Sequence, residues 1–100
     1  MDMRFLMKQA QAMQQKLLDA QQALRAEGTS GGESVKVTLN GAKELVGISI
    51  SKDAMDPEDP GMLEDLIVAA FKDASSKAEE AMSKVSGGLG GGLNIPGLKM

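Results

Sequence analysis

The longest helical pattern in the chain is DPEDPGMLEDLIVAAFKDASSKAEEAMSKV, residues 56–85. Asp59 and Pro60 form a typical helix start, because a carboxylate caps exposed backbone N–H groups and proline suits the first helical position. Apolar residues follow at spacings of three and four and therefore share one face. That face consists of Leu63, Ile67, Ala70, Ala74, Ala78, Ala81 and Val85, and Leu66, Val68 and Phe71 widen its first half. We expect a long amphipathic helix after Asp59 that packs on the rest of the chain.

The length and composition indicate one domain without a disulfide framework. The 100 residues include no cysteine, histidine, tryptophan or tyrosine, and the formal net charge is -3. No apolar run is long enough to span a membrane, and the charged, glutamine-rich N-terminus is unlike a signal peptide. The acidic balance argues mildly against indiscriminate attraction to nucleic acid. We therefore predict a soluble cytoplasmic protein with no membrane partner and no small-molecule substrate.

A second helical pattern occupies residues 2–27. Its apolar positions recur alternately at three and four residues over three heptads, as in a coiled-coil seam. The seam consists of Met3, Leu6, Ala10, Met13, Leu17, Ala20 and Leu24. Two interpretations remain open at this point. The seam packs on the second helix of its own chain, or part of it meets another subunit.

Between the two helices, the sequence predicts a turn followed by a β-hairpin. Residues 27–33, EGTSGGE, contain three glycines and are expected to end the helix and form a turn. From 34 to 51, apolar and polar residues alternate on both sides of Asn40-Gly41, which is a strong hairpin signal. We favour a four-residue loop, because it lines up apolar residues across the strands. The expected pairs are Val37 with Val46 and Val35 with Ile48.

The chain is predicted to divide into a single domain, residues 1–85, and a glycine-rich tail, residues 86–100. The tail contains six glycines and a proline and is expected to be disordered. Two long helices on one small hairpin leave more apolar surface than a monomer of this size covers well. Dimerisation is therefore a hypothesis from the residues alone.

No arrangement of catalytic or metal-binding residues stands out. Without histidine and cysteine, a catalyst would need Lys, Asp, Glu or Ser in a recognisable constellation, and none is found. Six carboxylates lie between Asp53 and Asp65, but their spacing does not match a calcium loop. Helix capping explains most of them. The sequence therefore predicts no enzyme, no cofactor and no metal site.

Five segments of the chain carry a resemblance to a known family. They are MKQAQ at 7–11, VKVTLNG at 35–41, DPED at 56–59, MLEDLIVAAFKDA at 62–74 and GGLNIPG at 91–97. Together they resemble the YbaB/EbfC family of bacterial nucleoid-associated proteins. The resemblance implies an α+β fold of order α-β-β-β-α and a tweezer-like homodimer. It also implies binding of double-stranded DNA with little or loose sequence preference, and a role in nucleoid organisation or gene expression. The chain departs from the family pattern in two places. It has fewer residues between the first helix and the glycine turn, so the first strand is expected to be very short or absent. It also has Pro60-Gly61 where the family usually has helix-compatible residues, which supports the later start of the second helix.

Binding of DNA without base reading relies on Lys and Arg at phosphates. The candidate DNA-binding residues are Arg4, Lys8, Lys16, Arg25, Lys72, Lys77 and Lys84. The plain alternative for each lysine is a solvated charge that pairs with a neighbouring acid, such as Asp73 or Glu80. The alternative function is a helix-mediated protein–protein adaptor or regulator without direct DNA binding. Only phosphate binding should weaken steeply with salt.

Overall fold

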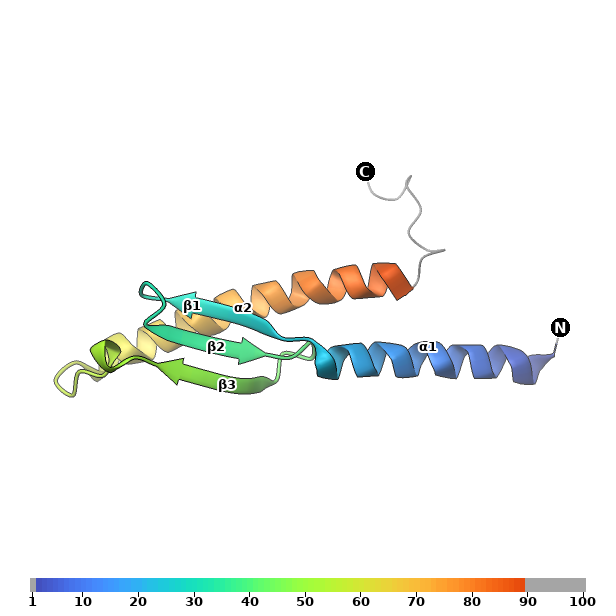
Figure 1. Cartoon of the computed structure of the whole chain (residues 1–100), viewed down its shortest axis with the longest axis horizontal. Coiled ribbons are helices and arrows are strands. Elements are labelled where there is room, and N and C mark those ends of the chain that lie inside the picture. Colours follow the sequence, from blue (N-terminus) through green and yellow to red (C-terminus); the bar gives the residue numbers. More distant parts are fainter. Residues whose placement is uncertain (1, 90–100) are drawn as a thin grey trace, which may run out of the picture.

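The structure is a computed structural model that describes residues 2–89 as two long helices joined by a three-stranded antiparallel sheet (Figure 1). The elements are α1 (Met3–Ala23), β1 (Ala26–Ser30), β2 (Val35–Leu39), β3 (Leu45–Ile50), the short 3-10 helix η1 (Lys52–Ala54) and α2 (Pro60–Leu89). The strand order is β1-β2-β3, so each strand pairs with its neighbour in sequence. The predicted α+β class and the order α-β-β-β-α are confirmed.

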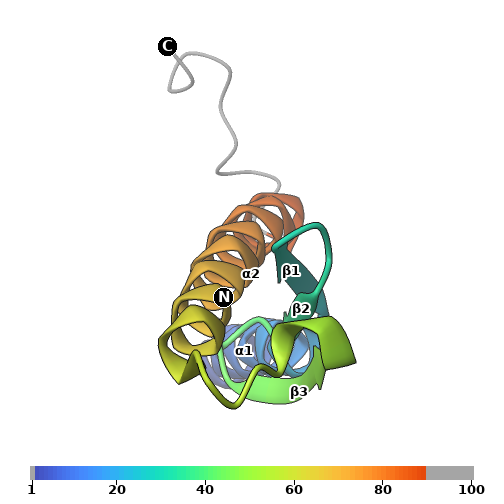
Figure 2. The ribbon, with the colours of Figure 1, turned by 90° about the vertical axis from the view of Figure 1, so that its left-hand side faces the viewer.

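The core lies between α2 and the inner face of the sheet, as the end-on view shows (Figure 2). In β2, Val35, Val37 and Leu39 are fully buried, and the polar residues between them are only half-buried. From the opposite side, α2 contributes Ala70 and Ala74, which are also fully buried. The predicted apolar face of α2 is therefore the face that meets the sheet, and its alanines allow the helix to come close.

The closest approach between α2 and the sheet is at Gly28 in β1. A Cβ atom on Gly28 would lie 2.2 Å from the backbone nitrogen of Ala74 and 2.3 Å from the carbonyl oxygen of Ala70. Real Cβ atoms do not approach backbone atoms this closely, so only glycine fits here. The helix backbone and the strand backbone are therefore in direct contact.

Hydrogen bonds to α2 also hold β1, a five-residue strand that was expected to be very short or absent. The Ser30 hydroxyl donates to the Leu66 carbonyl at 2.6 Å, and the Thr29 N–H donates to the Asp73 carboxylate at 3.1 Å. Residues 27–33 were expected to form a turn, but β1 runs to Ser30 and only the remainder turns. The contacts with α2 and the pairing with β2 override the weak strand preference of Ala, Gly and Ser.

The hairpin of β2 and β3 is confirmed, but its predicted register is wrong. Val37 faces Ile48 and Val35 faces Ile50, two residues away from the expected partners. The loop spans residues 40–44, and a β-bulge follows at the start of β3. The buried Asn40 accounts for the longer loop, because its side-chain oxygen accepts two loop N–H groups at 2.9 and 3.0 Å.

The helix α2 begins as predicted and ends later. Pro60 is its first residue, and the Met62 N–H donates to the Asp59 carboxylate at 3.2 Å. The helix continues to Leu89, beyond the predicted start of the tail at 86. The rest of the predicted tail, residues 90–100, lies outside the described part of the chain.

Two apolar residues of α2 that were expected to widen its buried face are exposed. Val68 is 52% exposed and Phe71 is 40% exposed. The reason is the lateral position of α2, which packs over β1 and β2 and leaves β3 largely uncovered. The flank that carries Val68 and Phe71 therefore has no element of the described chain against it.

The helix α1 projects beyond the sheet along the long axis of the molecule and has no buried residue (Figure 1). It ends at Ala23, earlier than the predicted 27, where the backbone becomes extended and leads into β1. Only its last turns touch the body, where the Gly41 N–H donates to the Gln21 carbonyl at 2.8 Å. Packing of the seam on the second helix of the same chain is therefore limited to this end, and the seam near Met3 and Leu6 is exposed.

Replacement of Gly28 by alanine is expected to destabilise the fold by about 1–3 kcal/mol, because the new methyl group overlaps the backbone of α2. Gly47→Ala is the matched control, since a Cβ atom at Gly47 in β3 meets nothing within 4 Å. Urea unfolding followed by circular dichroism measures both variants. Equal midpoints for the two variants would contradict the close contact between β1 and α2.

Candidate nucleic-acid interface

Three of the seven candidate cations lie on the projecting helix α1. Arg4, Lys8 and Lys16 are exposed, and none of them forms an ion pair within residues 2–89. At about 100° per residue, Arg4 and Lys8 lie on the side of α1 opposite the apolar seam, and Lys16 lies at the edge of that side. Residues 3–16 contain these three bases and no acid. We call Arg4, Lys8 and Lys16 the basic strip of α1.

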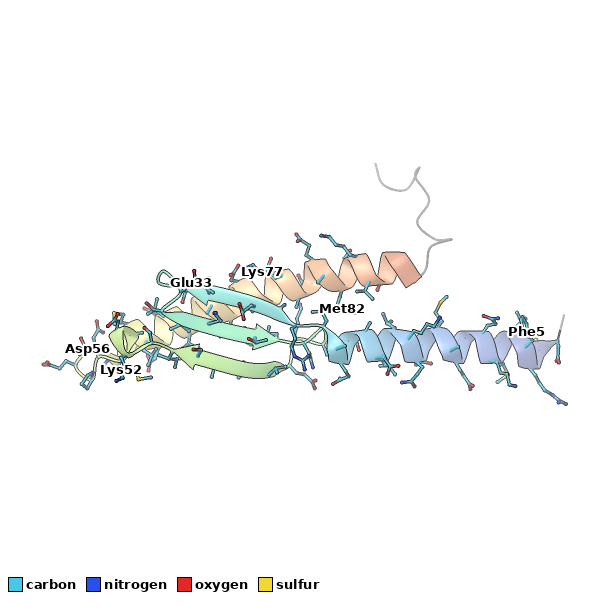
Figure 3. All side chains as sticks on the ribbon, in the orientation of Figure 1. Phe5, Glu33, Lys52, Asp56, Lys77 and Met82 are labelled. Carbon is cyan, nitrogen blue, oxygen red and sulfur yellow. The ribbon has the colours of Figure 1, made fainter. Side chains whose placement is uncertain are left out.

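Lys77 on α2 is already engaged with β1. Its ammonium group lies 3.2 Å from the Asp73 carboxylate and donates to the Glu27 carbonyl at 3.1 Å. The Thr29 N–H and, after it, Lys77 lower the pKa of Asp73 below its ordinary value. Figure 3 shows Lys77 on the side of α2 next to β1. The plain interpretation of a lysine paired with a nearby acid therefore holds for Lys77.

The other two candidates on α2, Lys72 and Lys84, are exposed and form no ion pair within the described residues. Lys84 lies two turns beyond Lys77 and shares its flank of the helix. Lys72 lies on a different exposed side, because five residues separate it from Lys77. The structure therefore does not bring the three lysines of α2 into one cluster.

Arg25 lies just after α1 and closes its C-terminal end. Its guanidinium Nη1 donates to the carbonyl oxygens of Gln22 at 2.7 Å and Leu24 at 2.9 Å. A cation is favourable at this position, because the last carbonyl groups of a helix carry partial negative charge. Arg25 thus has a capping role and remains an exposed residue.

Two cations outside the candidate set turn out to be paired across the fold. Lys43 in the β2–β3 loop forms an ion pair with Glu79 on α2 and lowers the pKa of that carboxyl group. Lys36 on the outer face of the sheet lies 3.7 Å from the Glu27 carboxylate. No local sequence signal reveals these pairs, because the partners lie 36 and 9 residues apart in the chain.

A cluster of six of the fourteen acidic residues lies at the end of the molecule opposite α1. Figure 3 shows Asp56 at one end and Phe5 at the other. Six carboxylates lie between Asp53 and Asp65, and within residues 2–89 no three of them come together as a metal site. A depression of about 450 Å³ at this end is lined mainly by the apolar groups of Met55, Pro57, Pro60 and Leu63, with Asp56.

No helix of the described chain is long and apolar enough to cross a membrane.

These features define a small α+β protein in which one long helix packs on a three-stranded antiparallel sheet and a second long helix projects from it. The same fold occurs in the crystal structure of the uncharacterized protein HP0035 from Helicobacter pylori, with a TM-score of 0.69 and 24% sequence identity. The similarity covers 89% of this chain and 97% of that chain. At this level of identity the comparison shows the fold alone.

The family follows from the sequence comparison. Residues 1–93 match the YbaB/EbfC DNA-binding family, and the chain belongs to this family. A protein of Pelotomaculum thermopropionicum is 48% identical over an alignment of 96 positions that covers 93% of this chain and 91% of the relative. A protein of Rhodococcus erythropolis is 47% identical over an alignment of 104 positions that covers 97% of this chain and 91% of the relative. Both relatives are named nucleoid-associated protein, and the resemblance drawn from the sequence is confirmed.

Replacement of Asp73 by asparagine is expected to lower stability at neutral pH, because the ionised carboxylate binds the Thr29 N–H and Lys77. Its pKa is lowered in the folded state, so this contribution is present above the ordinary pKa and is lost as the pH falls through the lowered value. The difference in unfolding free energy between wild type and variant should therefore shrink below about pH 3.9.

Chemical denaturation at a series of pH values measures this difference. Glu80→Gln is the control, because it removes an exposed carboxylate from the same helix that forms no ion pair within residues 2–89. A stability difference for Asp73→Asn that is the same at neutral and acid pH would show that the charge of Asp73 does not hold β1.

Proposed function

We propose that this protein binds double-stranded DNA as a homodimer, with little or loose sequence preference, through contacts of Lys and Arg with phosphates. The observation that supports this most strongly is the basic strip of α1. Its three cations lie exposed on a projecting helix, and within the described residues none is neutralised by an ion pair. Membership of a DNA-binding family supports the same conclusion.

The distribution of charge matters more here than its sum. A net charge of -3 would repel DNA if it were spread evenly. Instead, residues 3–16 hold three bases without an acid, whereas residues 53–65 hold six acids without a base. A duplex that approaches the basic strip therefore stays far from the acidic end, and the screening length of about 8 Å at physiological salt limits the repulsion between them.

The candidate cations differ in how freely they can meet a phosphate. Arg4, Lys8, Lys16, Lys72 and Lys84 are the proposed principal contacts, because none has an ionic partner within the described residues. Arg25 and Lys77 complete the proposed set, with smaller expected effects because each already donates to a carbonyl group.

Loose sequence preference follows from the kind of contact. Phosphate contacts position a protein on a duplex but carry no direct sequence information. A homodimer doubles each set of cations and fixes the spacing between the two sets along the duplex. We propose that binding of this kind takes place in the nucleoid, as the name nucleoid-associated protein of the relatives suggests. We also propose that it influences nucleoid organisation and gene expression.

Charge reversal on α1 tests the proposal. Arg4→Glu/Lys8→Glu is expected to weaken duplex binding and to reduce the slope of log K against log salt by about 0.9 for each phosphate that the protein no longer neutralises. Lys72→Glu/Lys84→Glu should act in the same direction from α2. Fluorescence anisotropy titrations of one duplex at two salt concentrations measure both effects, with the dimer state checked by light scattering.

The matched control is Lys52→Glu, which reverses one charge at the acidic end of the molecule and should leave the binding unchanged. Weakening by Lys52→Glu equal to that of Arg4→Glu alone would mean that only the net charge matters. Absence of binding by an intact wild-type dimer at low salt would favour the adaptor function, for which the exposed apolar residues of α1 offer a surface.

A further inference from the structure

We propose that the acidic end of the molecule, residues 53–65, binds a short segment of another protein in which Lys or Arg residues flank large apolar side chains. These residues comprise the end of η1, the loop after it and the first turns of α2. The apolar depression there takes the partner's apolar side chains, and the surrounding carboxylates pair with its bases. Such binding is separate from the proposed binding of DNA and does not require it.

The acidic end carries an open depression with an apolar lining. The lining consists of Met55, Pro57, Pro60 and Leu63 with Asp56, and the depression holds about 450 Å³. Met55 is 52% exposed, so much of its apolar side chain faces solvent. Pockets for small ligands hold about 300–1,000 Å³, so a depression of this size suits single side chains rather than a folded domain. An apolar surface with a polar rim is typical of a site for a protein partner.

Local contacts hold the depression in shape. The Ala54 N–H donates to the Ser51 carbonyl at 3.1 Å. Ala54 itself is buried in the core, so it anchors the loop to the body of the molecule. Further along, the Asp59 N–H donates to the Asp56 carbonyl at 3.0 Å, and the two prolines of the lining restrict the backbone. A surface that is already ordered loses little conformational entropy when a partner binds.

Most carboxylates of the acidic end have no bonding partner in the described fold. Asp56 accepts the Glu58 N–H at 2.9 Å, and Asp59 accepts the Met62 N–H at 3.2 Å. Capping and turn formation thus explain two of the six acids, fewer than expected from the sequence. Within residues 2–89 none of the six is in an ion pair, and no hydrogen bond is accepted by Asp53, Glu58, Glu64 and Asp65. Like charges this close together repel one another, and a basic partner would relieve the repulsion.

The charge of the acidic end selects the kind of partner. With six acids and no base in residues 53–65, this end repels nucleic acid and acidic proteins. A purely apolar segment would fill the depression but would leave the carboxylates without bases. A segment that has Lys or Arg beside its apolar side chains meets both requirements. Charges at the rim of such a contact speed association and exclude wrong partners.

A second copy of this chain suits the depression less well. Residues 3–8, MRFLMK, also combine bases with apolar residues. On α1, however, Arg4 and Lys8 lie on the side opposite the seam that contains Met3 and Leu6. A seam residue placed in the depression would therefore turn both bases away from the carboxylates. The partner segment must instead present its bases and its apolar side chains on the same side.

Binding of labelled peptides to the full chain, in the absence of DNA, tests the proposal. The probe is a fluorescent peptide of sequence Lys-Arg-Leu-Phe-Leu-Lys-Arg. One control peptide has serine in place of the apolar residues, and the other has glutamine in place of the bases. Fluorescence anisotropy should show that wild type binds each control peptide on the order of tenfold more weakly than the probe, because each control loses one of the two kinds of contact.

Variants of the acidic end separate the two kinds of contact. Glu58→Gln/Glu64→Gln should weaken binding of the probe roughly fivefold at low salt. Asp19→Asn/Glu80→Gln is the matched control, because it removes two exposed carboxylates outside the acidic end that form no ion pair within residues 2–89. Met55→Ser should weaken binding of the probe and leave binding of the serine peptide unchanged. Circular dichroism checks that each variant is folded.

Methionine methyl NMR locates the site without any substitution. The probe is added to wild type that carries an isotopic label on its methionine methyl groups. The signals of Met55 and Met62 at the acidic end should shift, whereas those of Met7 and Met13 on α1 should stay in place. Shifts confined to α1 would overturn the proposal.

Three further outcomes would also overturn it. Wild type would fail to bind the probe, the serine peptide would bind as tightly as the probe, or the control pair of substitutions would weaken binding as much as Glu58→Gln/Glu64→Gln. Binding of the probe by Arg4→Glu/Lys8→Glu but not by wild type would assign the depression to α1 of a second copy and thus reject a foreign segment. Because no DNA is present, each of these results leaves the DNA-binding proposal to its own test.

Discussion

Direct backbone contact between α2 and β1 at Gly28 is the constraint on which the rest of the structure depends. Because Gly28 has no side chain, Ala70 and Ala74 bring the helix against the strand itself. The bond from Thr29 to Asp73 and the contact of Lys77 with β1 then fix the helix at this edge of the sheet. A helix held over β1 and β2 cannot also lie over β3. The same contact that closes the core therefore leaves one apolar edge of the sheet open.

The sequence predicted the elements that rest on local chemistry. The start of α2 after Asp59 follows from capping, and its alanine face follows from periodicity. The sequence missed what depends on tertiary contact. The residues of β1 have a weak strand preference, and contacts with α2 hold this strand in place. The register of β3 shifts because Asn40 lengthens the loop. The exposure of Phe71 depends on where α2 lies across the sheet, which no helical pattern specifies.

The candidate site shows the same division between local and tertiary information. The positions of Arg4 and Lys8 opposite the seam could be predicted, because helical spacing alone determines them. The partners of Lys77 could be predicted only in part. Asp73 lies one turn away, but the Glu27 carbonyl lies 50 residues away in sequence. The tertiary structure thus decides which cations remain available to bind a phosphate. The cations of α1 remain available, whereas Lys77 in the middle of α2 is already engaged.

The stability of α1 bears directly on the DNA-binding proposal. A helix of about 20 residues without a buried face is marginal in water, since most helical stability in proteins comes from packing. Within the described chain α1 has no buried residue and touches the body only at its last turns. A partner surface along the seam would supply the missing packing and hold Arg4 and Lys8 in fixed positions. Ordering of α1 before DNA arrives lowers the entropy cost of binding. The apparent duplex affinity per chain should therefore rise with protein concentration as the dimer forms, as mass action requires for a binding-competent dimer.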